Sequence, residues 1–190
     1  GRDTHNTLAS GHASMSLYGW VLPFSFSVSS QQKAFTQPFN RFAVQPKWKW
    51  ITVHAGFTSM SFSPHTVNGH IFQGVGVDFD RGEKWRVSAL SGRFAKAVDS
   101  DSLRNIPPVL KRTGQALRMR YGTNVSYSEI ILFHARDISN GVDTLTVKPR
   151  RNLAASLRGS AKLLPGLRIT AEMANSIMTR NSDAEKRQGQ

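Results

Sequence analysis

Apolar and polar residues alternate along most of this chain, and this period of two restricts the fold more than any other feature. Between Trp20 and Val28, large apolar residues occupy every second position, and Ser25 and Ser27 lie among the residues between them. The alternation recurs in residues 13–17, 51–58, 71–79, 85–89, 117–121, 131–136, 152–162 and 167–173. A strand places successive side chains on opposite faces, so this period indicates strands with one apolar and one polar face. The sequence therefore predicts an all-β chain.

The segments between these strands are of two kinds. Short turns are expected at Gly19 and at residues 80–82, 122–124 and 165–166, whereas residues 31–46, 96–112 and 137–150 are longer and polar. We expect an antiparallel meander of about nine to ten strands over residues 1–179, with short turns on one rim and long loops on the other. The polar tail, residues 180–190, is expected to be a loop or disordered.

One irregularity interrupts the alternation. Between the hairpin that ends near Ser30 and the turn at Asp80, the number of predicted strands differs by one from the number that an alternating up-and-down path requires. Either residues 41–44 or residues 59–62 form an extra strand, or one of the alternating segments does not span a membrane as the others would. No secretory signal peptide opens the chain, so an exported protein would be present here in its mature form or as a fragment. An odd number of strands fits poorly with a closed bacterial barrel, and for this reason we expect the chain to be a fragment of a longer protein.

Composition excludes a helical membrane protein but leaves a membrane barrel open. Hydrophobic residues make up only 39% of the chain, and no run of about 18 apolar residues occurs. The strands of a membrane barrel are apolar only at alternate positions, so low hydropathy does not count against them. Aromatic residues gather near the predicted strand ends, as in the interfacial girdles of such barrels. The predicted interface residues are Trp20, Trp48, Trp50, Trp85, Tyr121 and Tyr127. The alternative is a soluble β-sandwich or barrel whose apolar face is its core.

Basic residues are the most informative feature of the polar face. The chain has a formal charge of +13, and the alternation puts many of its cations inside strands on the polar side. If the apolar face meets lipid, the polar face lines a lumen, and a cationic lumen favours anionic solutes. The predicted lumen-facing residues are Lys84, Arg86, Arg118, Arg120, Arg136, Arg158, Lys162 and Arg168. The same cations would otherwise pair with acids on strands outside this chain, or bind lipopolysaccharide phosphates at the rim.

Catalytic and cofactor-binding patterns are weak. The chain has no cysteine and its six histidines are scattered, with only His65 and His70 close in sequence, so no metal site is predicted. The serines form no Gly-x-Ser-x-Gly motif. Residues 74–78 lack the third glycine and the helix of a dinucleotide site, and strand glycines more simply let other groups pass close by. We predict no enzyme activity and no cofactor.

Several sequence segments, in predicted strands and loops, resemble those of a known family. They are Gln37-Pro38-Phe39-Asn40-Arg41-Phe42, Lys47-Trp48-Lys49-Trp50-Ile51-Thr52-Val53-His54-Ala55-Gly56, Ser59-Met60-Ser61-Phe62-Ser63-Pro64-His65-Thr66 with Gly69-His70, and Gly74-Val75-Gly76-Val77-Asp78. In these segments the chain resembles outer-membrane β-barrel proteins of Bacteroidota type, a largely uncharacterised family. The resemblance extends from about Phe24 to Thr179 and implies a barrel in the outer membrane. It transfers no active residues, and family members are longer than this chain.

Two other classes of function compete with an outer-membrane barrel of structural or transport role. A soluble basic β-sheet protein would bind nucleic acid or other polyanions through Arg118, Arg120 and Tyr121. However, the basic residues are spread over many strands and no nucleic-acid-binding motif occurs. An outer-membrane enzyme would need a Ser/His/acid or Asp/His cluster assembled from distant strands, for which His54 and His134 are candidates. The favoured partners are the lipid bilayer, lipopolysaccharide and an anionic solute, without nucleic acid.

Overall fold

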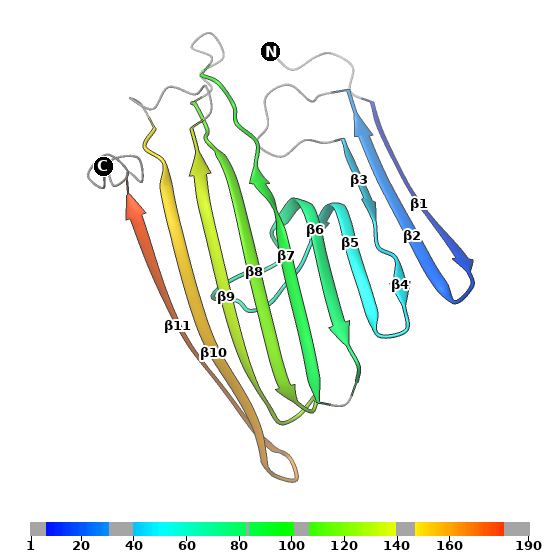
Figure 1. Ribbon diagram of the computed structural model, residues 1–190, viewed down its shortest axis with the longest axis vertical. Coiled ribbons are helices and arrows are strands. Elements are labelled where there is room, and N and C mark those ends of the chain that lie inside the picture. Colours follow the sequence, from blue (N-terminus) through cyan, green and yellow to red (C-terminus); the bar gives the residue numbers. More distant parts are fainter. Residues whose placement is uncertain (1–6, 31–39, 83, 101–106, 140–146, 181–190) are drawn as a thin grey trace.

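A single curved, antiparallel sheet contains every strand of the described chain (Figure 1). The computed structural model describes residues 7–30, 40–82, 84–100, 107–139 and 147–180. The strands are β1 (Leu8–Leu17), β2 (Trp20–Ser29), β3 (Arg41–Val44), β4 (Lys47–Trp48), β5 (Ile51–Ser59), β6 (Ile71–Asp80), β7 (Trp85–Ala95), β8 (Lys111–Gly122), β9 (Tyr127–Ile138), β10 (Arg150–Leu164) and β11 (Leu167–Arg180). They follow one another across the sheet in chain order, with β3 and β4 sharing the place between β2 and β5. The predicted all-β antiparallel meander is confirmed.

The structure resolves the mismatch in strand number. Residues 41–44 form β3, which pairs with β2 and β5, whereas β5 ends at Ser59 and the chain then leaves the sheet. A second short strand, β4, precedes a turn at Lys49 and Trp50 that the sequence did not predict. Lys49 has a positive φ of 50°, which non-glycine residues seldom adopt. These two short strands account for the eleven strands in place of the expected nine to ten.

The predicted tight turns are confirmed, and their residues explain their geometry. Tyr18 and Gly19 connect β1 to β2 with φ values of 48° and 81°, as a two-residue type I′ turn requires. Pro165 and Gly166 connect β10 to β11, and Gly166 has a φ of 92°, which suits the position after proline in a type II turn. The predicted long connections include residues 31–39, 101–106 and 140–146, which lie outside the described residues, as do residues 181–190 of the predicted tail.

Strand register divides the side chains between two faces. The face that carries Ser88, Arg118 and Ile131 is here called the loop face, because the segment between β5 and β6 lies against it. Ser88 and Ile131 both pair with Arg118, so these three side chains point the same way. The opposite face, with Val87, Leu117 and Leu132, is called the apolar face. The prediction of one apolar and one polar face therefore holds for most strands.

Strand β9 is the exception, because both of its faces carry apolar residues. The alternation predicted that Ile131, Phe133 and Ala135 lie on the apolar face. The register instead places them on the loop face, where Ile131 is fully buried. Ile130 and Leu132 occupy the apolar face and are 46% and 43% exposed. The period of two is ambiguous where both alternate sets are apolar, and here the covering segment decides which set is buried.

Residues 60–70, here called the covering loop, supply much of the buried core. They leave the end of β5, cross the sheet over β7 to β9 and return to the start of β6 (Figure 1). Met60, Phe62 and Val67 of the loop are each no more than 6% exposed. They pack in one cluster on side chains of the loop face, namely Phe72, Leu90, Ala116 and Ile131, with Phe94 and Phe133 at its edge. The core therefore lies between one loop and one face of the sheet.

Strand glycines make room for this loop and for close strand contact. A Cβ atom on Gly76 would lie 2.4 Å from the sulfur of Met60, so the absent side chain is what admits the loop. A Cβ atom on Gly74 would lie 2.2 Å from the carbonyl oxygen of Ser91 on the next strand. The interpretation of residues 74–78 as a strand whose glycines admit other groups is confirmed.

The two ends of the sheet are β1 and β11. Among the described residues β1 pairs with β2 and β11 with β10, and each has its other edge without a strand partner. Both edges are long, at 10 and 14 residues. No helix in the described ranges has the length and hydropathy needed to cross a bilayer.

Candidate functional site

The covering loop is a compact unit held by its own hydrogen bonds. The backbone N–H of Phe62 donates to the carbonyl of Val67 at 2.7 Å, and the N–H of Thr66 donates to the carbonyl of Ser63 at 3.4 Å. The Ser63 hydroxyl lies 3.1 Å from the Thr66 hydroxyl and accepts the N–H of His65 at 3.2 Å. These bonds fix a turn that presents its apolar side chains to the sheet.

Polar contacts tie the loop to distant strands. The Ser63 hydroxyl donates to Oε1 of Glu172 on β11 at 2.5 Å, and Ser156 on β10 donates to the same oxygen at 2.8 Å. Arg118 on β8 donates to the carbonyl of Ser61 at 3.3 Å, and its guanidinium lies 5.0 Å from the ring centre of Phe62. The loop thus contacts strands that follow it by 50 or more residues in the sequence, and it covers the middle of the loop face.

A charged network lies beside the loop and centres on Asp78 of β6. Its carboxylate is 2.8 Å from Nε2 of His54, accepts the Ser88 hydroxyl at 2.5 Å and lies 3.6 Å from Arg118. Arg118 also donates to the Ser88 hydroxyl at 2.7 Å. The network joins β5, β6, β7 and β8 on one face. Partly buried groups of opposite charge compensate one another here, as buried charges require.

A second ion pair lies closer to the tight turns. Glu129 on β9 is fully buried and accepts Nε–H of Arg120 at 2.5 Å. The Arg120 guanidinium lies 4.0 Å from the ring centre of Tyr127, a cation–π contact. The Arg168 guanidinium lies 6.0 Å from the centre of the same ring and donates to the Ser160 hydroxyl at 2.7 Å.

Most of the predicted basic residues share the loop face. Those placed there by the register are Arg86, Arg118, Arg120, Arg158, Lys162 and Arg168. Lys84 lies just before β7 in the connection from β6, where its carbonyl accepts the N–H of Gly122. The register contradicts the prediction for Arg136, which pairs with Thr113 and Arg151 and therefore belongs to the apolar face. The prediction for Arg136 failed because β9 carries apolar residues on both faces, so the alternation did not show which face is polar.

Acids of this chain already compensate several of these cations. In addition to the Arg118 and Arg120 contacts, Arg86 pairs with Asp80 at 3.0 Å, and Arg158 lies 4.0 Å from Glu172. Within the described ranges, Lys162 and Arg168 form no ion pair. The sequence did not indicate Glu129 as a partner, because the alternation assigned the residues of β9 to the wrong faces and so placed Glu129 on the apolar face.

The predicted aromatic residues divide in the same way. Trp20 stacks on Trp48 with ring centres 5.6 Å apart, and Trp85 packs against Tyr121 at 4.8 Å. Trp50 packs edge-on against Phe79 at 4.5 Å. These residues lie near the tight-turn ends of their strands, on the apolar face or in the adjoining turn. Tyr127 does not belong with them: it is 7% exposed on the loop face, under Arg120, so the register contradicts its predicted place.

The histidines and serines form no recognisable catalytic arrangement in the described part of the chain. Ser88 donates to Asp78 and not to His54, so the imidazole does not contact the hydroxyl it would need to activate. His134 lies on the apolar face of β9, opposite Gln115 and Leu153, and therefore on the other side of the sheet from this network. No group of three or more metal-ligating His, Asp or Glu side chains occurs among the described residues.

Comparison with protein-family models, with curated proteins and with solved structures finds no match for this chain. Its function must therefore be argued from the two faces of the sheet and from the loop.

Proposed function

We propose that this chain is part of an outer-membrane β-barrel, with its apolar face against lipid and its loop face lining the lumen. The observation that carries the proposal is the exposure of large apolar side chains across the whole sheet. Met15 on β1, Leu157 on β10 and Met173 on β11 are 56%, 59% and 78% exposed. Soluble proteins seldom expose an apolar surface of this extent, whereas a bilayer supplies a matching solvent.

Strand length and the aromatic residues support the same proposal. The longer strands have 9 to 15 residues, and a tilted strand needs about 9–11 to cross the hydrocarbon core. The Trp20–Trp48 and Trp85–Tyr121 pairs lie near one end of the strands, where amphipathic rings favour the boundary between lipid and water. A closed barrel also requires that β1 and β11 pair at their outer edges, with each other or with strands outside the described residues.

The charges of the loop face support a lumen that favours anions. On this face Asp78, Asp80, Glu129 and Glu172 are engaged with arginines, and Lys162 and Arg168 remain without an acid among the described residues. The surplus charge is positive, and rings of Arg or Lys favour anions in pores. The covering loop lies across this face and would narrow the lumen. We assign no catalytic role to the chain.

The first test asks whether the chain inserts in a bilayer. The chain is folded in the presence of liposomes, and insertion is measured by co-flotation with the vesicles and by resistance of the strands to added protease. We expect flotation that survives carbonate washing. Full recovery of folded chain in detergent-free buffer would overturn the membrane proposal, and tight nucleic-acid binding by that material would favour a soluble polyanion-binding protein.

The second test measures ion preference from the reversal potential of channels in planar bilayers under a KCl gradient. We expect preference for chloride, and we expect the double change Lys162→Gln with Arg168→Gln to reduce it. Arg136→Gln serves as the matched control, because it removes a similar charge from the apolar face. Preference for potassium in the unaltered protein would refute the anion proposal.

A further inference from the structure

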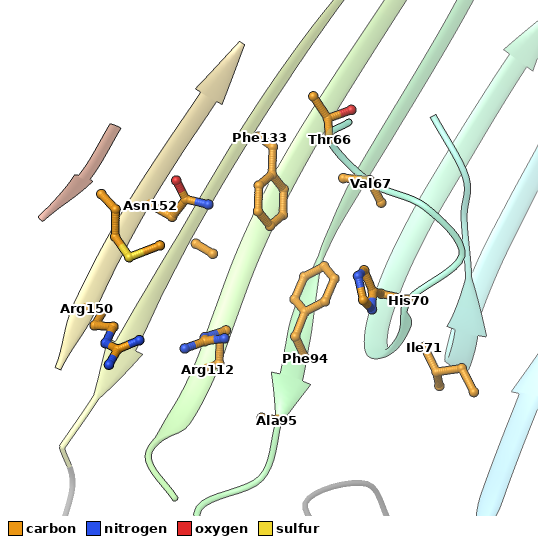
Figure 2. Close-up of a pocket in the computed structure, with 12 residues that line it drawn as sticks. Thr66, Val67, His70, Ile71, Phe94, Ala95, Arg112, Phe133, Arg150 and Asn152 are labelled. Atoms are coloured by element: carbon orange, nitrogen blue, oxygen red, sulfur yellow. The ribbon is translucent and has the colours of Figure 1, made fainter. Parts of the chain in front are cut away.

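A cavity of about 390 Å³ lies between the covering loop and strands β7 to β11 (Figure 2). One wall comes from the loop and the start of β6, and the other comes from the loop face near the ends of the strands. The volume is at the small end of the roughly 300–1,000 Å³ typical of small-molecule sites. The cavity is thus of a size for one compact molecule and not for a polymer.

Apolar side chains form the middle of this cavity. Phe94 and Phe133 meet edge to face with ring centres 5.8 Å apart, and both rings face the cavity (Figure 2). Val67 of the loop, 1% exposed, and Met178 of β11 complete these walls. Such walls favour a ligand with an apolar body, because its transfer from water buries apolar surface.

Two arginines define one end of the cavity, Arg112 on β8 and Arg150 at the start of β10 (Figure 2). Asp137 accepts two bonds from the Arg112 guanidinium, at 2.8 and 3.2 Å, and one from the backbone N–H of Arg150 at 3.2 Å. Asp137 therefore compensates Arg112, whereas the Arg150 guanidinium has no bonded partner among the described residues. One positive charge is therefore left over at one end of a cavity whose middle is apolar.

Two further observations concern polarity and access. Oδ1 of Asn152 in the cavity wall is buried without a hydrogen-bond partner among the described residues, so this part of the wall offers an acceptor to an N–H or O–H group and does not itself hold a carboxylate. A second cavity, of about 540 Å³, adjoins the first and shares Arg112 and Arg150 with it. It also contains Lys148, which adds positive charge on the approach to the arginines.

We propose that this cavity binds a small monoanion with a compact apolar body, of the class of aromatic carboxylates. The carboxylate meets the fork of Arg150, which matches it in geometry, and the ring packs on Phe94 and Phe133. The proposal rests on the function proposed above, which supplies the anionic solute. It adds the chemical class of that anion. It assigns to the covering loop the role of forming one wall of a binding site.

The test uses the full chain folded in detergent, with 2-naphthoate as the probe and 2-naphthylmethanol and acetate as its neutral and headgroup-only counterparts. Binding is measured by titration calorimetry after subtraction of empty micelles. Arg150→Gln is the variant, and Arg151→Gln is the matched control, because the adjacent residue lies on the apolar face and is also exposed. We expect Arg150→Gln to weaken naphthoate binding by about tenfold or more, and Arg151→Gln to leave it unchanged.

Tighter binding of naphthoate than of either counterpart, lost in Arg150→Gln alone, supports the site. Equal binding of naphthoate and naphthylmethanol, equal effects of the two variants, or no binding would overturn it. The measurement needs no pore, so the two proposals fail separately. Failure in the bilayer with retained naphthoate binding would remove the transport function and leave the site, whereas chloride preference without naphthoate binding would do the reverse.

Discussion

Replacing Ser63 with alanine should loosen the covering loop without detaching it. The change removes the 2.5 Å hydrogen bond to Glu172, together with the weaker contacts of the same hydroxyl with Thr66 and His65 inside the loop. The bond to the charged acceptor is the largest of these losses, at about 1.5–3 kcal/mol. Met60, Phe62 and Val67 remain buried, and each contributes about 1.5–3 kcal/mol through its apolar surface. The apolar contribution exceeds the loss, so the loop should stay on the sheet but open more often, by about 10- to 150-fold.

Hydrogen exchange measures this opening directly. The backbone N–H of Phe62 is bonded to Val67 within the loop and the Phe62 ring is buried against the sheet, so its exchange requires the loop to leave the sheet and this internal bond to break. Ser156→Ala is the matched control, because it removes a 2.8 Å bond to the same Glu172 oxygen from β10, not from the loop. We expect faster exchange at residues 61–67 in Ser63→Ala only. Equal exchange in the two variants, or additive effects of Ser63→Ala and Glu172→Ala in a double-mutant cycle, would refute the reasoning.

Three further changes test the packing and the environment of the sheet. Gly74→Ala should destabilise the fold more than Gly76→Ala in urea titrations, because the first added Cβ lies 2.2 Å from strand backbone, whereas the second overlaps the flexible side chain of Met60 and lies no nearer than 3.3 Å to backbone. Phe62→Ala should lower the unfolding free energy by about 3–5 kcal/mol in the same assay, since this buried ring anchors the loop. Leu157→Arg should cost about 2–4 kcal/mol when the chain folds into liposomes, and an effect near zero would argue against lipid at this face.

The sequence was sufficient for most strands and for the faces of nearly all of them. On some strands every second residue is polar, as with Ser25 and Ser27 on β2 or Arg118 and Arg120 on β8. There the alternation assigns each residue to one face without ambiguity, and the strand register agrees with that assignment. The tight turns were equally predictable, because positions such as Gly166 need a residue that tolerates positive φ.

The features that escaped prediction depend on tertiary contacts. On β9 both alternate sets are apolar, so only the covering loop determines that Ile131 is buried and that Glu129 faces Arg120. The loop itself carries few large apolar residues, and nothing local indicates that Ser63 reaches a strand 109 residues away. The cavity beside Phe94 and Arg150 follows from that same fold of the loop and was equally hidden.

The bond between Ser63 and Glu172 also bears on how the sheet assembles. Its partners are separated by 109 residues, so it forms only after β6 to β11 are in place. A slip of β11 by one residue against β10 would turn Glu172 to the apolar face and leave the Ser63 hydroxyl without its acceptor. The loop can thus close fully over only one alignment of the last hairpin, and its closure couples the register of the final strand to the early half of the chain.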